Sequence, residues 1–195
     1  MALTKNKNVL AWVDEMVALT KPDKVVWIDG SKEQLDALTD EVTSLPEGNR
    51  DKMYRLNEEK LPGCLYHRTL PNDVARVEDR TFICTKKKED AGPTNNWMAP
   101  DEMKAKLIPL YDGVMKGRTM YVIPYCMGPI GSPFSKVGVE VTDSIYVVLN
   151  MDIMTRIGLG ALRQLGDSND FVRGQHARAD IDAENRYIVH FPEDN

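Results

Sequence analysis

Residues 119–142 read TMYVIPYCMGPIGSPFSKVGVEVT, and this stretch contains two apolar runs rich in β-branched and aromatic residues. The first run covers 119–127 and the second 137–142, and a segment rich in glycine and proline separates them. Short apolar runs bounded by glycine and proline are typical of buried strands. The stretch therefore predicts two core strands joined by a loop.

The connecting loop, GPIGSPFSKVG, resembles a phosphate-binding loop at first sight, because glycine-rich segments with a lysine can wrap an anion in backbone N–H groups. The phosphate-binding pattern is G-x-x-x-x-G-K-[ST]. If Gly131 is taken as the first glycine of this pattern, Lys136 occupies the position of the second glycine and Val137 the position of the lysine. Pro129 and Pro133 also remove two N–H donors. We therefore interpret the loop as a structural connection between strands.

The flanking segments predict helices and strands around this pair. Residues 8–19 repeat apolar side chains at helical spacing, and VVWI at 25–28 is typical of a buried strand. Ser31 begins an S-x-x-Q capping box for a second helix that extends to Leu45. We predict a third helix over 145–158 and a final strand, RYIVHF, at 186–191. The fold class is therefore mixed α/β: one domain over residues 1–195, with a central mixed β-sheet flanked by helices.

The middle of the chain has weaker patterns. Residues 46–68 are charged and aperiodic, which predicts a loop-rich surface with a short helix. VARVE at 74–78 and TFICT at 81–85 are short runs typical of strands, and AGPTNNW at 91–97 is a polar loop. Pro100 begins a further helix, because proline is favoured in the first turn.

Composition excludes several classes of protein. Apolar residues make up 42% of the chain and charged residues 28%, as in an ordinary globular domain. The net charge of −5 argues against a nucleic-acid partner, because nucleic-acid-binding domains are usually basic. No apolar run approaches the roughly 20 residues needed to span a membrane, and the first ten residues lack a signal peptide's apolar core. We expect a cytoplasmic protein with no membrane partner.

The chain carries three cysteines and three histidines, which are far apart in sequence and fit neither a disulfide framework nor a usual metal-binding spacing. We expect reduced thiols and no metal ligands among them: Cys64, Cys84, Cys126, His67, His176 and His190.

Four segments together resemble the amino-terminal part of GTP-dependent phosphoenolpyruvate carboxykinases. They are DVARVE, AGPTNNWM, KGRTMYVIPYCMGPIGSPFSKVGVEVTDSIYVV and DIMTRIG, and the resemblance extends from about Val9 to His190. It implies the amino-terminal lobe of that fold. It also implies a reaction in which oxaloacetate loses carbon dioxide and the resulting enolate takes the terminal phosphoryl group of GTP, giving phosphoenolpyruvate and GDP in gluconeogenesis.

The resemblance implies one substrate-binding residue in this chain. In the family, the arginine of the V-A-R-[VI]-E segment binds the substrate carboxylate, and the matching residue is Arg76. A guanidinium suits this role because its planar fork of donors can bind a carboxylate through two hydrogen bonds. Glu78 lies two residues further on, so in a strand it would share a face with Arg76 and support the guanidinium.

The family's metal-binding, GTP-binding and lid segments have no counterpart here, and the sequence contains no G-K-[ST]. We therefore expect a chain cut before the carboxy-terminal nucleotide and metal domain. By this interpretation Mn²⁺ or Mg²⁺ and GTP act only in the full-length enzyme, which we expect to be a monomer. The chain alone is expected to bind none of these cofactors, to have no catalytic residue and to be inactive.

An alternative is a free-standing, non-catalytic domain that binds small dicarboxylates or another protein. Binding of oxaloacetate or phosphoenolpyruvate by the isolated chain would separate the two hypotheses, because tight selective binding is expected only of an independent binder. The strand RYIVHF would lie at the edge left by the cut, so we expect any self-association to occur there.

Overall fold

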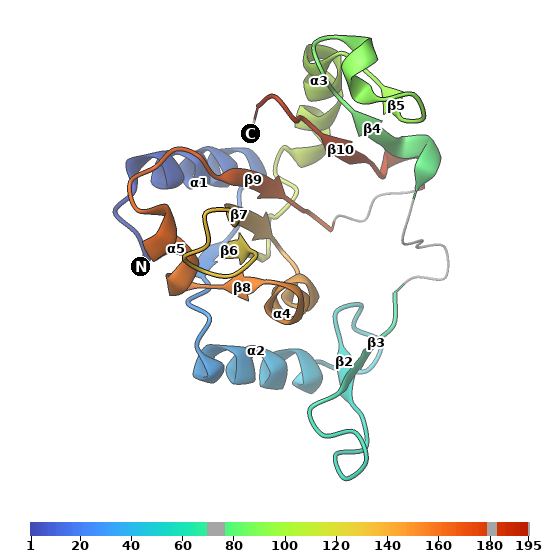
Figure 1. Ribbon diagram of the computed structural model, residues 1–195. Helices are drawn as coiled ribbons and strands as arrows, with labels where there is room; N and C mark the ends of the chain where they lie inside the picture. Colours follow the sequence, from blue (N-terminus) through green and yellow to red (C-terminus); the bar gives the residue numbers. More distant parts are fainter. Residues whose placement is uncertain (70–76, 179–182, 195) are drawn as a thin grey trace.

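The computed structural model describes residues 1–69, 77–178 and 183–194, and it shows a mixed α/β fold (Figure 1). Within these residues the largest sheet has five strands in the order β1-β6-β7-β9, with β8 paired to β6. The β1/β6 and β7/β9 pairs are parallel, whereas β6/β7 and β6/β8 are antiparallel. The strands are β1 (Lys24–Trp27), β6 (Thr119–Met127), β7 (Lys136–Thr142), β8 (Arg156–Ile157) and β9 (Val172–Gln175). The mixed central sheet predicted from the sequence is confirmed.

The centre of the sheet is the β6–β7 hairpin. Its register pairs Met127 with Lys136 next to the loop and Tyr121 with Thr142 at the far end. Side chains alternate between the two faces of each strand, so β6 supplies apolar residues to the cores on both faces. The buried apolar residues of β7 lie in one of these cores. The predicted strand pair joined by a glycine-rich loop is confirmed.

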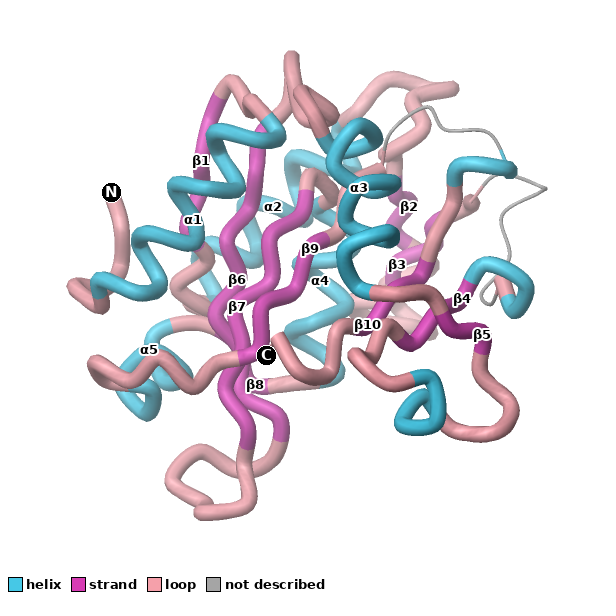
Figure 2. The backbone as a smooth tube through the Cα atoms, turned by 90° about the horizontal axis from the view of Figure 1, so that it is seen from above, coloured by secondary structure: helices cyan, strands magenta, loops and turns pink. Residues whose placement is uncertain are grey.

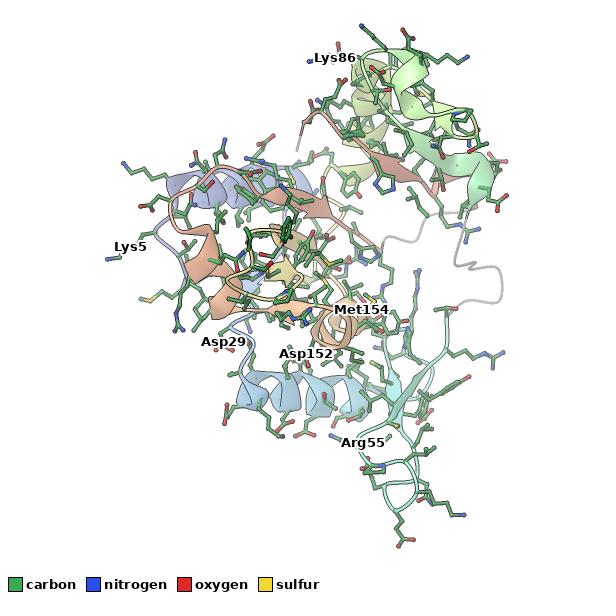
Figure 3. The ribbon with its side chains drawn as sticks, viewed as in Figure 1. Lys5, Asp29, Arg55, Lys86, Asp152 and Met154 are labelled. Atoms are coloured by element: carbon green, nitrogen blue, oxygen red, sulfur yellow. The ribbon has the colours of Figure 1, made fainter. Side chains whose placement is uncertain are left out.

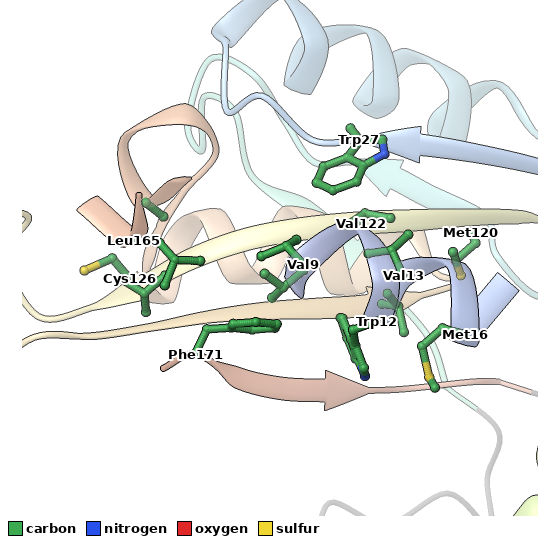
Figure 4. Close-up of a cluster of buried hydrophobic side chains, with 14 of the residues drawn as sticks. Val9, Trp12, Val13, Met16, Trp27, Met120, Val122, Cys126, Leu165 and Phe171 are labelled. Atoms are coloured by element: carbon green, nitrogen blue, oxygen red, sulfur yellow. The ribbon is translucent and has the colours of Figure 1, made fainter. Parts of the chain in front are cut away.

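One face of the sheet is covered by α1 (Lys7–Thr20) and α5 (Leu159–Leu165). Figure 2 shows α1 lying across the strands, with α2 (Lys32–Ser44) and α4 (Ile145–Met154) behind them. The buried cluster beneath α1 is drawn in Figure 4, where Trp12 meets Phe171 edge to face at 6.1 Å between ring centroids. The cluster includes Val9, Trp12, Met16, Met120, Val122, Val139, Val141, Leu165 and Phe171.

The opposite face is covered by α2 and α4, which bury Leu38 and Val148 against Ile123. The predicted cap of α2 is present, because Ser31 Oγ accepts a hydrogen bond from Gln34 N at 3.2 Å. Gln34 does not complete a reciprocal box. Its side chain instead donates to Trp27 O at 2.9 Å, and this bond ties the helix to β1.

A second, smaller sheet lies beside the main one and has the parallel order β10-β4-β5. Its strands are β4 (Thr81–Ile83), β5 (Asn96–Trp97) and β10 (Ile188–His190), and the helix α3 (Pro100–Tyr111) follows β5. Short 3₁₀ turns precede β4, β5 and β10: η1 (Glu78–Arg80), η2 (Lys88–Ala91) and η3 (Ala183–Asn185). The predicted strand within 186–191 is confirmed, and within the described residues β10 is an edge strand.

Several predictions about local structure are wrong. The polar loop predicted at 91–97 ends in the strand β5. Residues 46–68 contain no short helix but an antiparallel hairpin, β2 (Met53–Arg55) and β3 (Leu65–His67). Arg55 of this hairpin forms an ion pair with Asp40 of α2 at 2.6 Å, and its side chain is labelled in Figure 3. The helix predicted over 145–158 ends at Met154, because Arg156 and Ile157 pair with β6 instead. Ile153, near the end of α4, is 81% exposed.

The described helices include none with the length and apolar character of a membrane-spanning segment. The three cysteines are free: Cys64 is exposed, whereas Cys84 and Cys126 are buried.

Candidate functional site

Glu78, the residue predicted to support the substrate-binding arginine, lies at the start of the smaller sheet. Arg76 lies outside the described residues, so its contact with a carboxylate stays a prediction. Glu78 is exposed and begins the 3₁₀ turn η1, so its predicted placement in a strand is wrong. The turn forms because Val77 O accepts hydrogen bonds from Arg80 N at 3.0 Å and from Thr81 Oγ1 at 2.7 Å.

The backbone at Glu78 is held by its neighbours. Asn96 Nδ2 of β5 donates to Glu78 O at 2.6 Å and to Thr81 O at 3.0 Å. Arg80 donates to Glu184 O, and its guanidinium lies 5.6 Å from the ring centroid of Tyr187. The turn that follows the predicted substrate-binding segment is therefore fixed to β5 and to the turn before β10.

The structure brings together a second set of residues that the sequence patterns did not connect. A cavity of about 440 Å³ lies between the β2–β3 hairpin, the start of α4 and the segment that follows β9. Its lining includes six basic side chains and no aspartate or glutamate among the described residues. We call it the cationic pocket and define it by Arg50, Lys52, His67, Arg68, His176 and Arg178.

Local contacts hold the hairpin side of the cationic pocket in place. Lys52 Nζ donates to Leu45 O at 2.6 Å and to Thr43 O at 3.1 Å, and it lies 3.5 Å from the Glu47 carboxylate. His67 stacks on Tyr146, the second residue of α4, with 4.7 Å between ring centroids. The hairpin and α4 therefore form adjoining walls.

The opposite wall depends on a buried set of charges. The Asp143 carboxylate, whose side chain has no exposed surface, lies 2.9 Å from Arg118 Nη2 and accepts a hydrogen bond from Arg178 N at 3.0 Å. Arg118 Nη1 also donates to Arg178 O at 2.8 Å. Arg178 itself forms an ion pair with Asp51, which precedes β2. These contacts join the turn between β7 and α4 to the segment after β9.

Several N–H groups of the glycine-rich loop are occupied within the protein. Gln164 Oε1 of α5 accepts a hydrogen bond from Gly131 N at 2.8 Å, and Gln164 Nε2 donates to Ser135 Oγ at 2.5 Å. Phe134 N donates to Ser132 Oγ, and Ser135 N donates to Ser132 O. The prediction that this loop is a structural connection is confirmed by these contacts.

One carboxylate lies in an unusual environment. Glu140, in the middle of β7, is opposite Ile123 on one side and Gly174 on the other. Its Oε2 occupies the space that a β-carbon at position 174 would fill, so only glycine fits there. Burial raises the pKa of Glu140 to about 7. Burial, followed by the nearby carboxylates of Glu140 and Asp143, raises the pKa of Tyr111 to about 12.

The described residues contain no group of three histidine, cysteine, aspartate or glutamate side chains placed to hold a metal ion. No sequence signal could have identified the cationic pocket, because its walls come from residues 48–54, 67–69, 144–147 and 176–178. Each segment by itself looks like an ordinary polar turn or strand end.

Comparisons with known proteins agree with the resemblance. The sequence matches the phosphoenolpyruvate carboxykinase N-terminal domain over residues 11–195. A protein of Anaeromyxobacter dehalogenans (strain 2CP-C) named phosphoenolpyruvate carboxykinase (GTP) is 56% identical over 98% of this chain and 31% of its own length. Proteins of the same name from Corynebacterium jeikeium and Corynebacterium glutamicum (ATCC 13032) are 45% and 46% identical, over 99% and 98% of this chain and 33% and 32% of their own lengths. The chain thus spans about a third of the length of the curated relatives it matches.

Proposed function

Because the chain belongs to the phosphoenolpyruvate carboxykinase N-terminal domain family, we propose that it forms the substrate-side part of a GTP-dependent phosphoenolpyruvate carboxykinase. The proposed overall reaction converts oxaloacetate and GTP to phosphoenolpyruvate, GDP and carbon dioxide, in gluconeogenesis. The observation that carries the proposal is the match over residues 11–195, together with relatives at 45–56% identity that bear this name.

The role proposed for this chain is to hold the substrate by a carboxylate. Oxaloacetate is a dianion, and decarboxylation requires that one carboxylate be gripped while the other leaves. The guanidinium of Arg76 would supply two parallel donors and so fix orientation as well as charge. We propose that Glu78 supports this arginine, and the hydrogen bond from Asn96 to the Glu78 backbone holds Glu78 in place.

Phosphoryl transfer requires GTP and a divalent cation such as Mn²⁺ or Mg²⁺, which stabilise the charge that develops on the enolate and phosphate oxygens. The described residues do not fit either group, because they contain no candidate cluster of three metal ligands and the whole sequence contains no G-K-[ST]. We therefore derive no step of phosphoryl transfer from this chain. We also propose that the chain by itself forms no phosphoenolpyruvate, and that the whole enzyme is a cytoplasmic monomer.

A chimera tests the proposed carboxylate contact. In it, this chain replaces the matching 192 residues of the Anaeromyxobacter dehalogenans protein. Arg76→Ala in this chimera should lower kcat/KM for oxaloacetate about 10- to 150-fold, which corresponds to the ~1.5–3 kcal/mol of a charged hydrogen bond. Arg76→Lys should recover only part of the loss, because an ammonium keeps the charge but not the two-donor geometry.

Arg163→Ala is the matched control, because Arg163 is exposed on α5 and far from residue 76 in sequence. It should leave kcat/KM unchanged. If Arg76→Ala changed kcat/KM by less than about twofold while the chimera remained folded and active, Arg76 would not contact the substrate.

A further inference from the structure

The turn η1 begins two residues after the arginine proposed to grip the substrate, and a side chain of β5 holds it. We propose that Asn96 is a positioning residue for substrate binding: it holds η1, and it thereby sets where the chain that leads from Arg76 enters the smaller sheet. The inference rests on the proposed function, because it assumes that Arg76 contacts the oxaloacetate carboxylate. It also gives a role to AGPTNNWM, a segment that the proposed reaction leaves without one.

One side-chain amide connects both ends of η1 to β5. Asn96 Nδ2 donates to Glu78 O at 2.6 Å and to Thr81 O at 3.0 Å, which are the first residue of the turn and the first residue of β4. An amide NH₂ group carries two donors and no charge, so it suits two neighbouring carbonyl acceptors. The parallel register places Asn96 beside Phe82, close to the turn that precedes β4. A shift of the turn relative to β5 would therefore break both hydrogen bonds.

Two other contacts of η1 act in different directions. Thr81 Oγ1 donates to Val77 O at 2.7 Å, which stabilises the turn itself, and Arg80 donates to Glu184 O in the turn before β10. Neither contact involves β5, so the bonds from Asn96 are a separate restraint. Asn96 is exposed, and β4 and β5 also pair through their backbones. Replacing its side chain should therefore loosen the turn without unfolding the smaller sheet.

The position of η1 matters because only a short piece of chain separates it from Arg76. Two residues of chain span at most about 7 Å, so the turn limits where the guanidinium can meet a carboxylate. A displacement of about 1 Å in a substrate-holding group can lower the rate about 100-fold, and a segment that must be ordered on binding weakens affinity. Because Arg76 would hold the substrate before and during the reaction, a looser turn should mainly raise KM for oxaloacetate.

The chimera described above tests the inference through Asn96→Asp, which keeps the shape of the side chain but replaces its donors with an acceptor. We expect KM for oxaloacetate to rise about five- to tenfold, as for the loss of one or two hydrogen bonds, and KM for GTP to stay unchanged. Asn96→Ala, which adds no charge, should raise KM for oxaloacetate at least about threefold. Asn95→Asp is the matched control, because Asn95 Nδ2 donates to Ala91 O at 2.7 Å within its own loop. It should change neither KM.

A double variant separates positioning from general destabilisation. If Asn96 acts through Arg76, then Asn96→Asp should change KM for oxaloacetate less than about twofold in a chimera that already carries Arg76→Ala. A second measurement uses the 195-residue chain alone. There Asn96→Asp should accelerate amide hydrogen exchange at Arg80, whose N–H donates to Val77 O within the turn.

Equal KM values for oxaloacetate in Asn96→Asp and Asn95→Asp would overturn the inference. A full effect of Asn96→Asp beside Arg76→Ala would also overturn it, as would unchanged exchange at Arg80 in the chain alone. If Arg76→Ala itself left kcat/KM for oxaloacetate unchanged, the proposed contact of Arg76 would fail and the inference would fall with it. Failure of the Asn96 variants alone would leave the proposed function standing.

Discussion

At the scale of single residues, Glu140 shows how the sheet tolerates a charge near its centre. Gly174 on the neighbouring strand leaves space for the carboxylate, which is largely buried. Burial disfavours the charged form, so its pKa rises from 4.5 to about 7. The folded protein therefore binds a proton more tightly at Glu140 than the unfolded chain does.

This difference predicts a pH dependence of stability. Because the folded pKa is the higher one, the contribution of Glu140 is most favourable below pH 4.5 and is lost as the pH rises through about 7. Glu140→Gln should remove this dependence and raise the free energy of unfolding at pH 8 by up to about 3 kcal/mol. Urea denaturation at pH 5.5 and pH 8 measures both effects. Glu15→Gln, at an exposed position of α1, is the control. If Glu140→Gln and Glu15→Gln changed the free energy of unfolding equally at pH 8, the burial of Glu140 would not destabilise the folded protein at that pH.

At the scale of elements, the glycine-rich loop owes its shape to a helix that follows it in sequence. Gln164 of α5 binds Gly131 N and Ser135 Oγ, so it spans the loop between β6 and β7. The loop also carries exposed apolar side chains, with Phe134 92% exposed. Hydrogen bonds within the loop and to Gln164, and not burial, therefore fix its conformation.

Replacing Gln164 tests this account of the loop. Gln164→Ala should lower the free energy of unfolding by about 1 kcal/mol, the usual net value of hydrogen bonds of this kind. It should also accelerate amide hydrogen exchange at Gly131, because that N–H loses its acceptor. Arg163→Ala, one position away on α5, should do neither. Unchanged exchange at Gly131 in Gln164→Ala would show that other contacts fix the loop.

The elements also show what the sequence could predict. β6 and β7 were predictable because their apolar runs are bounded by glycine and proline, and α1 because its apolar residues repeat at helical spacing. The β2–β3 hairpin was not predictable, because its strands are only three residues long and one residue among the six is buried. The end of α4 was missed because pairing of Arg156 and Ile157 with β6 overrides a pattern that still favours a helix.

The candidate site residues also include some that the sequence could predict and some that it could not. Arg76 and Glu78 could be named because the V-A-R-V-E segment resembles a family motif, whereas the 3₁₀ turn at Glu78 depends on hydrogen bonds to Val77 that no local pattern reveals. The cationic pocket could not be predicted, because it exists only where four distant segments meet.

At the scale of the whole molecule, the buried charges around Asp143 connect segments that are far apart in sequence. Asp143 binds Arg118, which precedes β6, and the backbone of Arg178, which follows β9. Arg178 in turn binds Asp51 before the β2–β3 hairpin. Removing one partner of a buried ion pair leaves the other charge without compensation, and this destabilises the folded state.

Asp143→Ala should therefore lower the free energy of unfolding by about 3–5 kcal/mol. The double variant Arg118→Met/Asp143→Leu should be less destabilised, because no buried charge is left alone. Asp152→Ala, at the exposed position of α4 labelled in Figure 3, is the control and should change stability by less than about 0.5 kcal/mol. Urea unfolding measures all three. A loss below about 1 kcal/mol for Asp143→Ala would show that the network is not a main support of the fold.

The central claim is that this chain supplies the substrate-side part of a GTP-dependent phosphoenolpyruvate carboxykinase. The most direct measurement is formation of phosphoenolpyruvate from oxaloacetate and GTP, with Mn²⁺, by the chimera with the Anaeromyxobacter dehalogenans protein. We predict a kcat within about tenfold of the parent enzyme, because a correctly placed lobe costs at most about 1.4 kcal/mol of activation free energy. A folded chimera that binds GTP but forms no phosphoenolpyruvate, beside an active parent enzyme, would contradict the claim.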